Sequence, residues 1–373
     1  MNLKLHIISF DIPYPPDYGG VIDVFYKIRN LHRLGVEIIL HCFQYGNRTP
    51  QDELNQYCNK VYYYKRNVGL KGLSIHLPYI VSSRKCNELL QNLLMDNYPI
   101  LFEGIHTTYY LNSPLLQGRF KLVRNHNIEA NYYYYLSHYT QSFFKKKYYQ
   151  WESKRLYQYE KKLEGFSFLL PISERETAHF KKYYSPNEVI HVPAFHEFEK
   201  VVSKAGRGNY CLFHGNLSVA ENEKSAIYLI ETIFNDLEIL LIIAGKNPSQ
   251  KLCDLANDKI KIINNPSKIE MDELIQNAQI NVLPNFQQTG IKLKLLHSLF
   301  AGRFCITNDD KLEKSLANET IFAKDSMEFK NRIIYLFNED FTEEHIEKRK
   351  SNLKQFDNVT NAQLITKLLQ AEF

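Results

Sequence analysis

The sequence predicts an α/β protein made of two domains, each built on a doubly wound parallel sheet. Apolar runs typical of strands alternate with helical periodicity along most of the chain. The length of 373 residues suits two domains of roughly 100–200 residues each. The alternation lapses between Pro193 and Asn209, where a charged stretch and Ala205-Gly206-Arg207-Gly208 indicate a linker. The predicted domains are residues 1–195, completed by a C-terminal helix at 355–373, and residues 205–350.

The first half of the chain contains short apolar runs separated by helical stretches. The predicted strands are Leu3–Phe10, Val36–Phe43, Val61–Tyr64, Ile100–Glu103, Lys121–Arg124, Phe168–Pro171 and Val189–Val192. Helices are expected at Gly20–Leu34 and Lys85–Met95. A longer helical pattern spans Glu129 to Glu164 without Pro or Gly, and Gly165 is its expected stop.

The second half repeats the same plan of a strand, a glycine-bearing turn and a helix. The predicted strands are Tyr210–Phe213, Glu238–Ala244, Ile260–Ile263, Gln279–Leu283 and Phe304–Thr307. The predicted helices are Asn222–Phe234, Lys268–Asn277, Gly290–Ala301 and Ser326–Phe337. The tail from 343 to 369 is expected to be helical, with a break near Asp357-Asn358.

Composition narrows the class of protein. Apolar residues make up 44% and charged residues 23%, which is typical of a globular protein. The net charge of +5, without a nucleic-acid-binding motif, argues against a nucleic-acid partner. The six cysteines show no CxxC spacing, so no zinc site or redox pair is expected. No signal peptide and no run of roughly 20 apolar residues is present, so we expect a cytoplasmic protein, at the inner face of the plasma membrane if it meets one.

Polar residues concentrate where the predicted strands end. In doubly wound sheets, ligands bind beyond the carboxyl ends of the strands. Those ends are rich in His, Asn and Gly in this chain: Asp11–Gly20, Glu103–His106, Arg124–Asn127, His214–Asn216, Gly245–Asn247 and Pro284–Gly290. The sequence therefore predicts a binding cleft along one rim of each sheet.

Two glycine-bearing helix starts suggest an anion site. The segment Thr289–Gly302 follows an apolar strand, turns at Gly290 and opens a helix. Gly19-Gly20 follows the first strand in the same way. A glycine lets a ligand approach the backbone, and the free N–H groups of a helix start suit a diphosphate. We predict one anion held between the two domains, although Gly19-Gly20 alone also fits a tight turn after the Pro-rich loop.

Lysines and an asparagine add to this predicted anion site. Lys292 and Lys294 fall in the first turn of the second helix, after Ile291. Cations there oppose the helix dipole, so the two lysines make sense if an anion binds between them; otherwise they are solvated charges. In His214-Gly215-Asn216, Asn216 is a candidate donor to a phosphate oxygen, and a turn asparagine is the alternative.

Two histidines follow strands of the first half. His126 can hydrogen-bond a sugar hydroxyl or stabilise a developing charge, or it can anchor its loop. His106 has the same placement, with Glu103 one turn earlier. The Glu103 carboxylate fits either a ligand hydroxyl or a lysine partner. The candidate acceptor contacts are Tyr14, Glu103, His106 and Arg124.

The chain is rich in tyrosine, with 26 residues. Several lie close to basic residues, and Lys145-Lys146-Lys147 is followed by Tyr148, Tyr149 and Trp151. Such a segment can lie on an anionic membrane at about 1 kcal/mol per basic residue. Half-buried tyrosines and a solvated helix face are the alternative interpretation.

The whole chain resembles a known family on these residues: Gly19-Gly20, His126, His214-Gly215-Asn216, Ala244-Gly245-Lys246, and Thr289-Gly290-Ile291-Lys292 with Ala301-Gly302. The last of these is the most specific. The family is the retaining, nucleotide-sugar-dependent glycosyltransferases of group 1, with two Rossmann-like domains facing across a cleft (the GT-B fold). It includes bacterial mannosyl- and glucosyltransferases of surface-polysaccharide synthesis.

The resemblance implies roles for these residues. The second domain would bind a nucleoside diphosphate sugar, and the first would bind the acceptor. The base and ribose would lie near Gly245, Lys246 and His297, and His126 would contact a sugar hydroxyl. The diphosphate would meet Lys292, the amides around Gly290 and Ile291, and the Gly19-Gly20 loop.

The chain departs from the family pattern in two places. The family commonly has two glutamates seven residues apart, and here they fall on His297 and on or beside Thr289. The family's Arg and Lys for the diphosphate fall near Asn216 and Asn222. These departures fit a variant subgroup in which Lys292 takes over the phosphates, or a weakened enzyme.

The expected function is a retaining glycosyltransferase that moves a hexose to a glycan on a lipid carrier. The expected catalytic residues are His126, Lys292 and Thr289. No metal or other cofactor is expected, because amides and lysine would neutralise the phosphates. The expected partners are the nucleotide sugar, the glycan acceptor and a membrane surface. The alternatives are a nucleotide-sugar epimerase of the same fold and a non-catalytic sugar-nucleotide-binding protein.

Overall fold

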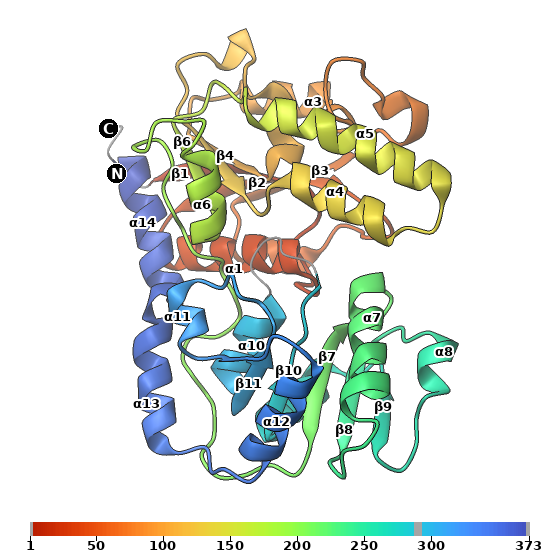
Figure 1. The fold of residues 1–373 in the computed structure, drawn as a ribbon. Coiled ribbons are helices and arrows are strands. Elements are labelled where there is room, and N and C mark those ends of the chain that lie inside the picture. Colours follow the sequence, from red (N-terminus) through yellow and green to blue (C-terminus); the bar gives the residue numbers. More distant parts are fainter. Residues whose placement is uncertain (1–2, 287–292, 371–373) are drawn as a thin grey trace. The chain divides into compact units, whose positions relative to one another are not determined.

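The computed structural model describes residues 3–286 and 293–370. These residues form two compact α/β units (Figure 1). The first unit contains residues 3–197 and 355–370, and the second contains residues 198–286 and 293–354.

The first unit contains a six-stranded sheet in the order β3-β2-β1-β4-β5-β6. Its strands are β1 (Lys4–Ser9), β2 (Glu37–Gln44), β3 (Lys60–Lys65), β4 (Ile100–Glu103), β5 (Lys121–Asn125) and β6 (Phe168–Pro171). Every neighbouring pair is parallel. The strand order reverses between β1 and β4, and such a switch point is where ligands bind in sheets of this kind.

Helices cover both faces of this first sheet (Figure 1). Leu101 lies in an apolar cluster with residues of α1 (Gly19–Arg33) and α14 (Asn358–Gln370). Its neighbours Ile100 and Phe102 lie in a second cluster, with residues of α3 (Asn87–Leu93) and α6 (Glu174–Phe180). Alternate residues of a strand point to opposite faces, so each strand contributes to both clusters. Each buried Leu, Ile or Phe contributes about 1.5–3 kcal/mol to folding.

The second unit repeats this topology in the order β12-β11-β10-β7-β8-β9, again with parallel pairs. Its strands are β7 (Cys211–Asn216), β8 (Leu241–Lys246), β9 (Ile260–Asn264), β10 (Ile280–Val282), β11 (Phe304–Thr307) and β12 (Ile321–Phe322). Its helices are α7 (Ala220–Tyr228), α8 (Gln250–Cys253), α9 (Lys268–Asn277), α10 (Leu293–Ala301), α11 (Lys314–Ala317), α12 (Ser326–Phe337) and α13 (Glu343–Asn352). The strand order reverses between β7 and β10. The predicted fold class, two doubly wound parallel sheets, is confirmed.

Three predicted elements differ from the structure. The single helix predicted from Glu129 to Glu164 is wrong: α4 (Glu129–Tyr139) and α5 (Phe143–Glu160) form a helical hairpin, and the Ser142 side chain caps α5 by accepting from Lys145 N. The strand predicted at Val189–Val192 is only an isolated bridge at Val189. Helix α7 ends at Tyr228 and continues as a π-helical turn, Leu229–Ile233.

None of the helices in residues 3–286 and 293–370 combines the length and the apolar character needed to cross a bilayer.

A buried hydrogen-bond chain crosses β1, β2 and β3. His6 Nε2 lies 2.8 Å from Asp96 Oδ1, and His6 Nδ1 lies 2.8 Å from His41 Nε2. His41 Nδ1 lies 2.8 Å from the Tyr64 hydroxyl, which accepts from Asn92. Because the Asp96 carboxylate only accepts, the chain is satisfied when each imidazole carries one proton. Burial lowers the pKa of both His6 and His41.

This chain of hydrogen bonds predicts that acidic pH destabilises the first unit. A histidine whose pKa is lowered on folding stabilises the protein above about pH 6.5, and this contribution is lost as the pH falls through the lowered value. We expect a loss of about 1 kcal/mol from each of His6 and His41 between pH 7 and pH 5.5. Urea unfolding at the two pH values, followed by the fluorescence of Trp151, the single tryptophan, measures this loss of unfolding free energy. An equal pH dependence in a His6→Gln/His41→Gln variant would contradict the assignment.

Candidate functional site

The rim of the first sheet brings together the residues that follow β1, β4 and β5. The Phe10 ring lies between two imidazoles, with its centroid 5.3 Å from that of His106 and 5.4 Å from that of His126. A Cβ on Gly20 would lie 2.6 Å from Phe10 Cζ. A side chain at position 20, where α1 begins, would therefore require the Phe10 ring to shift. The predicted rim residues Gly20, His106 and His126 thus meet around one side chain.

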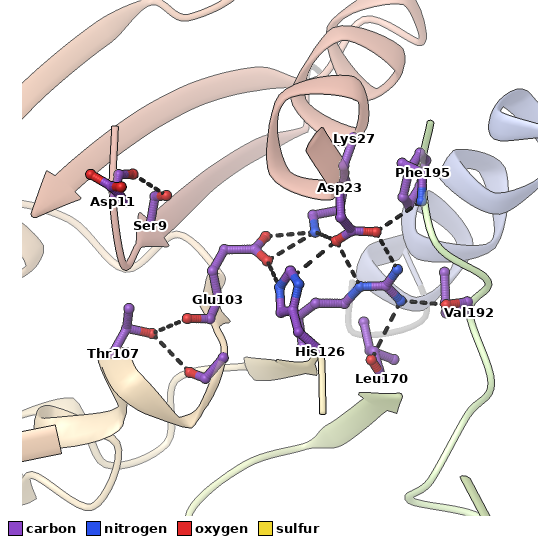
Figure 2. A network of polar contacts seen from close by, with 12 residues as sticks. Ser9, Asp11, Asp23, Lys27, Glu103, Thr107, His126, Leu170, Val192 and Phe195 are labelled. Carbon is purple, nitrogen blue, oxygen red and sulfur yellow. Dashed lines mark hydrogen bonds and ion pairs between the residues drawn. The ribbon is translucent and has the colours of Figure 1, made fainter. Parts of the chain in front are cut away.

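A buried network of charged residues holds His126 in place (Figure 2). Lys27 Nζ lies 2.8 Å from both Asp23 Oδ2 and Glu103 Oε1. Arg124 donates to both oxygens of Asp23, at 2.7 and 3.1 Å. His126 Nε2 lies 3.0 Å from Glu103 Oε2. Two carboxylates and two cations thus balance one another beneath the histidine.

The charges in this network fix the ionisation of its carboxyl groups. Burial by itself would raise the pKa of Asp23, but Arg124 and Lys27 hold it well below its ordinary value. Burial would likewise raise the pKa of Glu103, and Lys27 and His126 lower it. Asp23, Glu103 and His126 are spaced closely enough to ligate a metal ion. The Lys27 ammonium already lies between the two carboxylates and serves as the cation of the cluster.

The network also sets the orientation of the His126 ring. A carboxylate only accepts hydrogen bonds, so Nε2 carries the proton that faces Glu103. In the neutral ring, Nδ1 then presents a lone pair. Within residues 3–286 and 293–370, His126 Nδ1 makes no hydrogen bond. It is the ring atom available to accept a hydrogen bond from a ligand hydroxyl.

Glu103 and Arg124, two of the predicted acceptor contacts, lie in the interior of the first unit. Both residues are 0% exposed. Arg124 is held by Asp23 and by the carbonyl oxygens of Val192 and Pro193, and Glu103 by Lys27 and His126. In these surroundings the two residues position the rim, and their contact with an acceptor stays a prediction. Asp23 and Lys27 were missed, although charged residues on the apolar stripe of α1 were a visible signal.

The two other candidate acceptor contacts differ from each other. The Tyr14 ring is half-buried and packs 5.5 Å from Phe25, so it belongs largely to the core. His106 is half-buried at the rim, and its Nδ1 is buried without a hydrogen-bond partner among the described residues. Burial, followed by Arg84 and Arg66, lowers the pKa of His106 well below its ordinary value. A neutral imidazole therefore faces the rim.

The rim of the second sheet centres on the end of β7. The Asn216 backbone oxygen accepts from Asn222 Nδ2 at 2.8 Å, and its side chain accepts from Ser218 N at 3.1 Å. The imidazole of His214 is buried, with Nε2 2.9 Å from Ser298 Oγ. Its ring fastens β7 to α10, and a contact of His214 with the donor stays a prediction.

Lys294 joins α10 to the loop after β7. Its Nζ donates to Asn222 Oδ1 at 3.0 Å and lies 5.0 Å above the centre of the Phe213 ring. Lys294 also lines a small pocket with Leu283, Asn285, Leu295, Thr307, Asp309 and Leu312. Asn285 Nδ2 donates to Asp309 Oδ2 at 2.7 Å, so the loops after β10 and β11 meet there. A lysine ammonium is thus placed at the switch point of this sheet.

The remaining predicted donor contacts of the second unit have structural roles of their own. A Cβ on Gly245 would lie 1.8 Å from the Gly215 oxygen, so glycine is required where β7 and β8 approach. The Lys246 carbonyl accepts from Leu217 N at 2.8 Å. His297 Nε2 lies 3.0 Å from Asp272 Oδ1, a different partner from the predicted ribose. Their contacts with a donor stay predictions.

The predictions for Thr289, Gly290, Ile291 and Lys292 fall outside the described residues.

Comparison with known proteins agrees with this geometry. Residues 208–339 match the protein family described as "Glycosyl transferases group 1". A protein of Klebsiella pneumoniae, described as an uncharacterized 44.6 kDa protein in the cps region, is 28% identical over 356 residues, covering 89% of this chain and 90% of that protein.

Two solved structures share the fold across both units. Anabaena Alr3699/HepE, in complex with UDP and glucose, has a TM-score of 0.65 at 12% identity, over 99% of this chain and 100% of that chain. A mutant of S. aureus TarM, in complex with Fondaparinux, alpha-GlcNAc-glycerol and UDP, has a TM-score of 0.67 at 10% identity, over 98% and 99% of the two chains. The fold is therefore GT-B. With the matched domain, it defines the protein as an enzyme of the glycosyltransferase class.

Proposed function

We propose that the protein transfers a hexose from a nucleoside diphosphate sugar to a glycan acceptor, with retention at the anomeric carbon. The group 1 match across the second unit supports the nucleotide-sugar donor. The complexes of the two structural neighbours make UDP sugars the first donors to test. The cps-region relative supports a role in surface-polysaccharide synthesis.

The observation that carries this proposal is the contact between Lys294 and Asn222. In the family that the chain resembles, an arginine and a lysine from the first strand and helix of the second domain grip the diphosphate. Here asparagines stand near both positions, at Asn216 and Asn222. The Lys294 ammonium lies 3.0 Å from the Asn222 side chain, which restores a positive charge at this place from a different helix.

A cation at this place has a clear chemical use. As the bond between the sugar and the diphosphate breaks, negative charge grows on the leaving phosphate. A pre-positioned ammonium stabilises that charge more in the transition state than in the ground state. Lys292 and the amides around Gly290 and Ile291, proposed from sequence, would add to it. The first turn of α1 at Gly19 has no acidic residue and no side-chain cap, so its N–H groups suit an anion as well.

His126 is proposed to hold a sugar hydroxyl through Nδ1. Glu103 keeps the proton on Nε2, so Nδ1 accepts a hydrogen bond from the hydroxyl. His106, with its buried and unpaired Nδ1, is the other candidate for a hydroxyl contact among the described residues of this rim. The acceptor is proposed to be a growing glycan on a lipid carrier.

Release of nucleoside diphosphate tests the proposed function. The purified protein is incubated with UDP-glucose, UDP-galactose and UDP-N-acetylglucosamine, with and without a panel of glycan acceptors. A transferase releases UDP only when an acceptor is present, and the anomeric configuration of the product reports retention. Release of UDP and free sugar without acceptor favours an epimerase. Binding without release would leave a non-catalytic binding protein.

Metal removal gives a further expected result. If Lys294 and backbone amides neutralise the diphosphate, chelation with EDTA should change the transfer rate by no more than about twofold. The measurement compares initial rates with EDTA and with added Mg²⁺ or Mn²⁺. Loss of activity in EDTA, restored by either metal, would show that the phosphates need a divalent cation.

A further inference from the structure

We infer that the first unit carries a surface that docks on an anionic lipid bilayer. This docking surface consists of exposed apolar residues from the loop after β3 and from α5: Val68, Leu70, Leu73, Ile75, Phe143, Phe144 and Trp151. The inference adds a partner to the proposed function. It does not depend on the donor chemistry, because none of these side chains belongs to the phosphate or sugar-hydroxyl contacts proposed above.

The residues of the docking surface are unusually exposed for their size. Leu70, Ile75 and Phe144 are 86%, 87% and 84% exposed. Val68 and Phe143 are close behind at 66% and 65%. Single exposed apolar residues are common on folded proteins, but several large ones gathered on two adjoining segments indicate an interaction surface.

The loop after β3 packs against α5. Arg155 of α5 donates to the carbonyl oxygens of Ser74 and Leu77, which ties the loop to the helix. Ile75 and Trp151 line the same hollow. On α5, Phe144 and Trp151 are seven residues apart, so they lie on the same face of the helix. Figure 1 shows α5 running along the outside of the first unit, antiparallel to α4.

The charge of this region selects the partner. No acidic residue occurs between Glu53 and Glu88, a stretch that contains the whole loop. The α4–α5 hairpin has only three acidic residues, Glu129, Glu152 and Glu160, and all three are buried. Glu160 accepts from two N–H groups at the start of α4, and Glu152 accepts from two at the start of α2 (Tyr79–Ser82). These acids therefore present no negative charge to a partner.

The exposed charges of the same region are basic. Lys145, Lys146 and Lys147 follow directly after the two phenylalanines, and Lys154 and Lys71 lie beside Trp151 and Leu70 in the sequence. Apolar side chains that enter the interface, surrounded by lysines that reach the headgroups, fit an anionic bilayer. Each lysine near such a surface raises the partition constant roughly fivefold. An acidic protein partner would need matching carboxylates at fixed positions, whereas lipid headgroups adapt to this spread of charges.

Binding to vesicles tests the inference. The full-length protein is sedimented with vesicles of phosphatidylcholine mixed with phosphatidylglycerol, and with vesicles of phosphatidylcholine alone. We expect binding to the mixed vesicles, a blue shift of Trp151 emission, and binding to the neutral vesicles at least about tenfold weaker. An Ile75→Ser/Phe144→Ser variant and a Lys145→Glu/Lys146→Glu/Lys147→Glu variant should each lose at least about tenfold in partition.

Matched controls keep this test decisive. A Met327→Ser/Tyr335→Ser variant removes exposed apolar residues of α12, at 71% and 61% exposure, and should bind like the wild type. All variants should keep the wild-type rate of UDP release with a water-soluble acceptor, so a failure of docking is distinct from a failure of the proposed function. The inference is overturned if the wild type stays unbound. It is also overturned if the variants bind equally, or if the surface instead drives self-association that the same substitutions abolish.

Discussion

Replacing Lys294 with Ala should lower the rate of sugar transfer by about 100-fold or more. Removing one pre-positioned donor to a developing oxyanion has an effect of this size in other enzymes. Lys294 Nζ is held by Asn222 at 3.0 Å, so the side chain is positioned before a ligand arrives. The fold should be little affected, since Lys294 is half-exposed and its helix keeps Leu295, Leu296 and Leu299 in the core. Initial rates of UDP release measure the effect.

The position of the lysine allows a sharper control than a single substitution. In an Asn222→Lys/Lys294→Asn variant, the lysine and the asparagine exchange positions. The ammonium then lies on α7, and the pair of side chains is kept. This variant should be at least about tenfold more active than Lys294→Ala, because the charge is present again near the same place. Lys348→Ala, an exposed lysine of α13, should leave the rate unchanged. If Lys294→Ala transfers sugar at the wild-type rate, the role proposed for Lys294 is refuted.

Replacing Lys27 with Met should lower the free energy of unfolding of the first unit by about 3–5 kcal/mol. Lys27 is 0% exposed and lies 2.8 Å from the carboxylates of both Asp23 and Glu103. Asp23 keeps Arg124 as a partner after the substitution, but Glu103 keeps only His126. A buried carboxylate would then lack its main cation, and the cost is largest for such groups. Urea unfolding followed by Trp151 fluorescence gives the magnitude.

Two further variants separate this effect from a general loss of packing. Lys4→Met removes the solvent-accessible pair of Lys4 with Glu37 in the same unit, at 3.2 Å, and should cost no more than about 1 kcal/mol. Lys27→Met/Glu103→Gln removes the uncompensated charge and should recover a large part of the lost stability. If the double variant is as unstable as Lys27→Met, the shape of the lysine matters and its charge does not.

The fold could be predicted from the sequence because its strands are short apolar runs separated by amphipathic helices. The predictions that failed concern helix boundaries that are set by polar side chains. The break between α4 and α5 contains neither Pro nor Gly; it depends on Ser142, whose side chain caps the next helix. A single turn of capping hydrogen bonds competes with helix continuation, and periodicity does not register that competition.

The site could be predicted only in part, for a similar reason. His126 and Asn216 at strand ends and Lys294 at the start of a helix were recognisable as candidates, because the rim of a doubly wound sheet is where polar residues gather. The burial of Glu103 and Arg124 could not be recognised from the sequence, because it depends on α1 bringing Asp23 and Lys27 against the ends of β4 and β5. Spacing along one helix places Asp23 and Lys27 on one face, but only tertiary packing identifies what that face meets.

Calorimetric titration of UDP and of uridine tests the central claim most directly. The central claim is that the Lys294 ammonium meets a diphosphate at the end of β7. It predicts that the wild-type protein binds UDP more tightly than uridine, and that Lys294→Ala loses about tenfold or more of the affinity for UDP, as for a hydrogen bond to a charged group, while uridine binding is unchanged. Equal affinity of the wild type and Lys294→Ala for UDP would contradict the account.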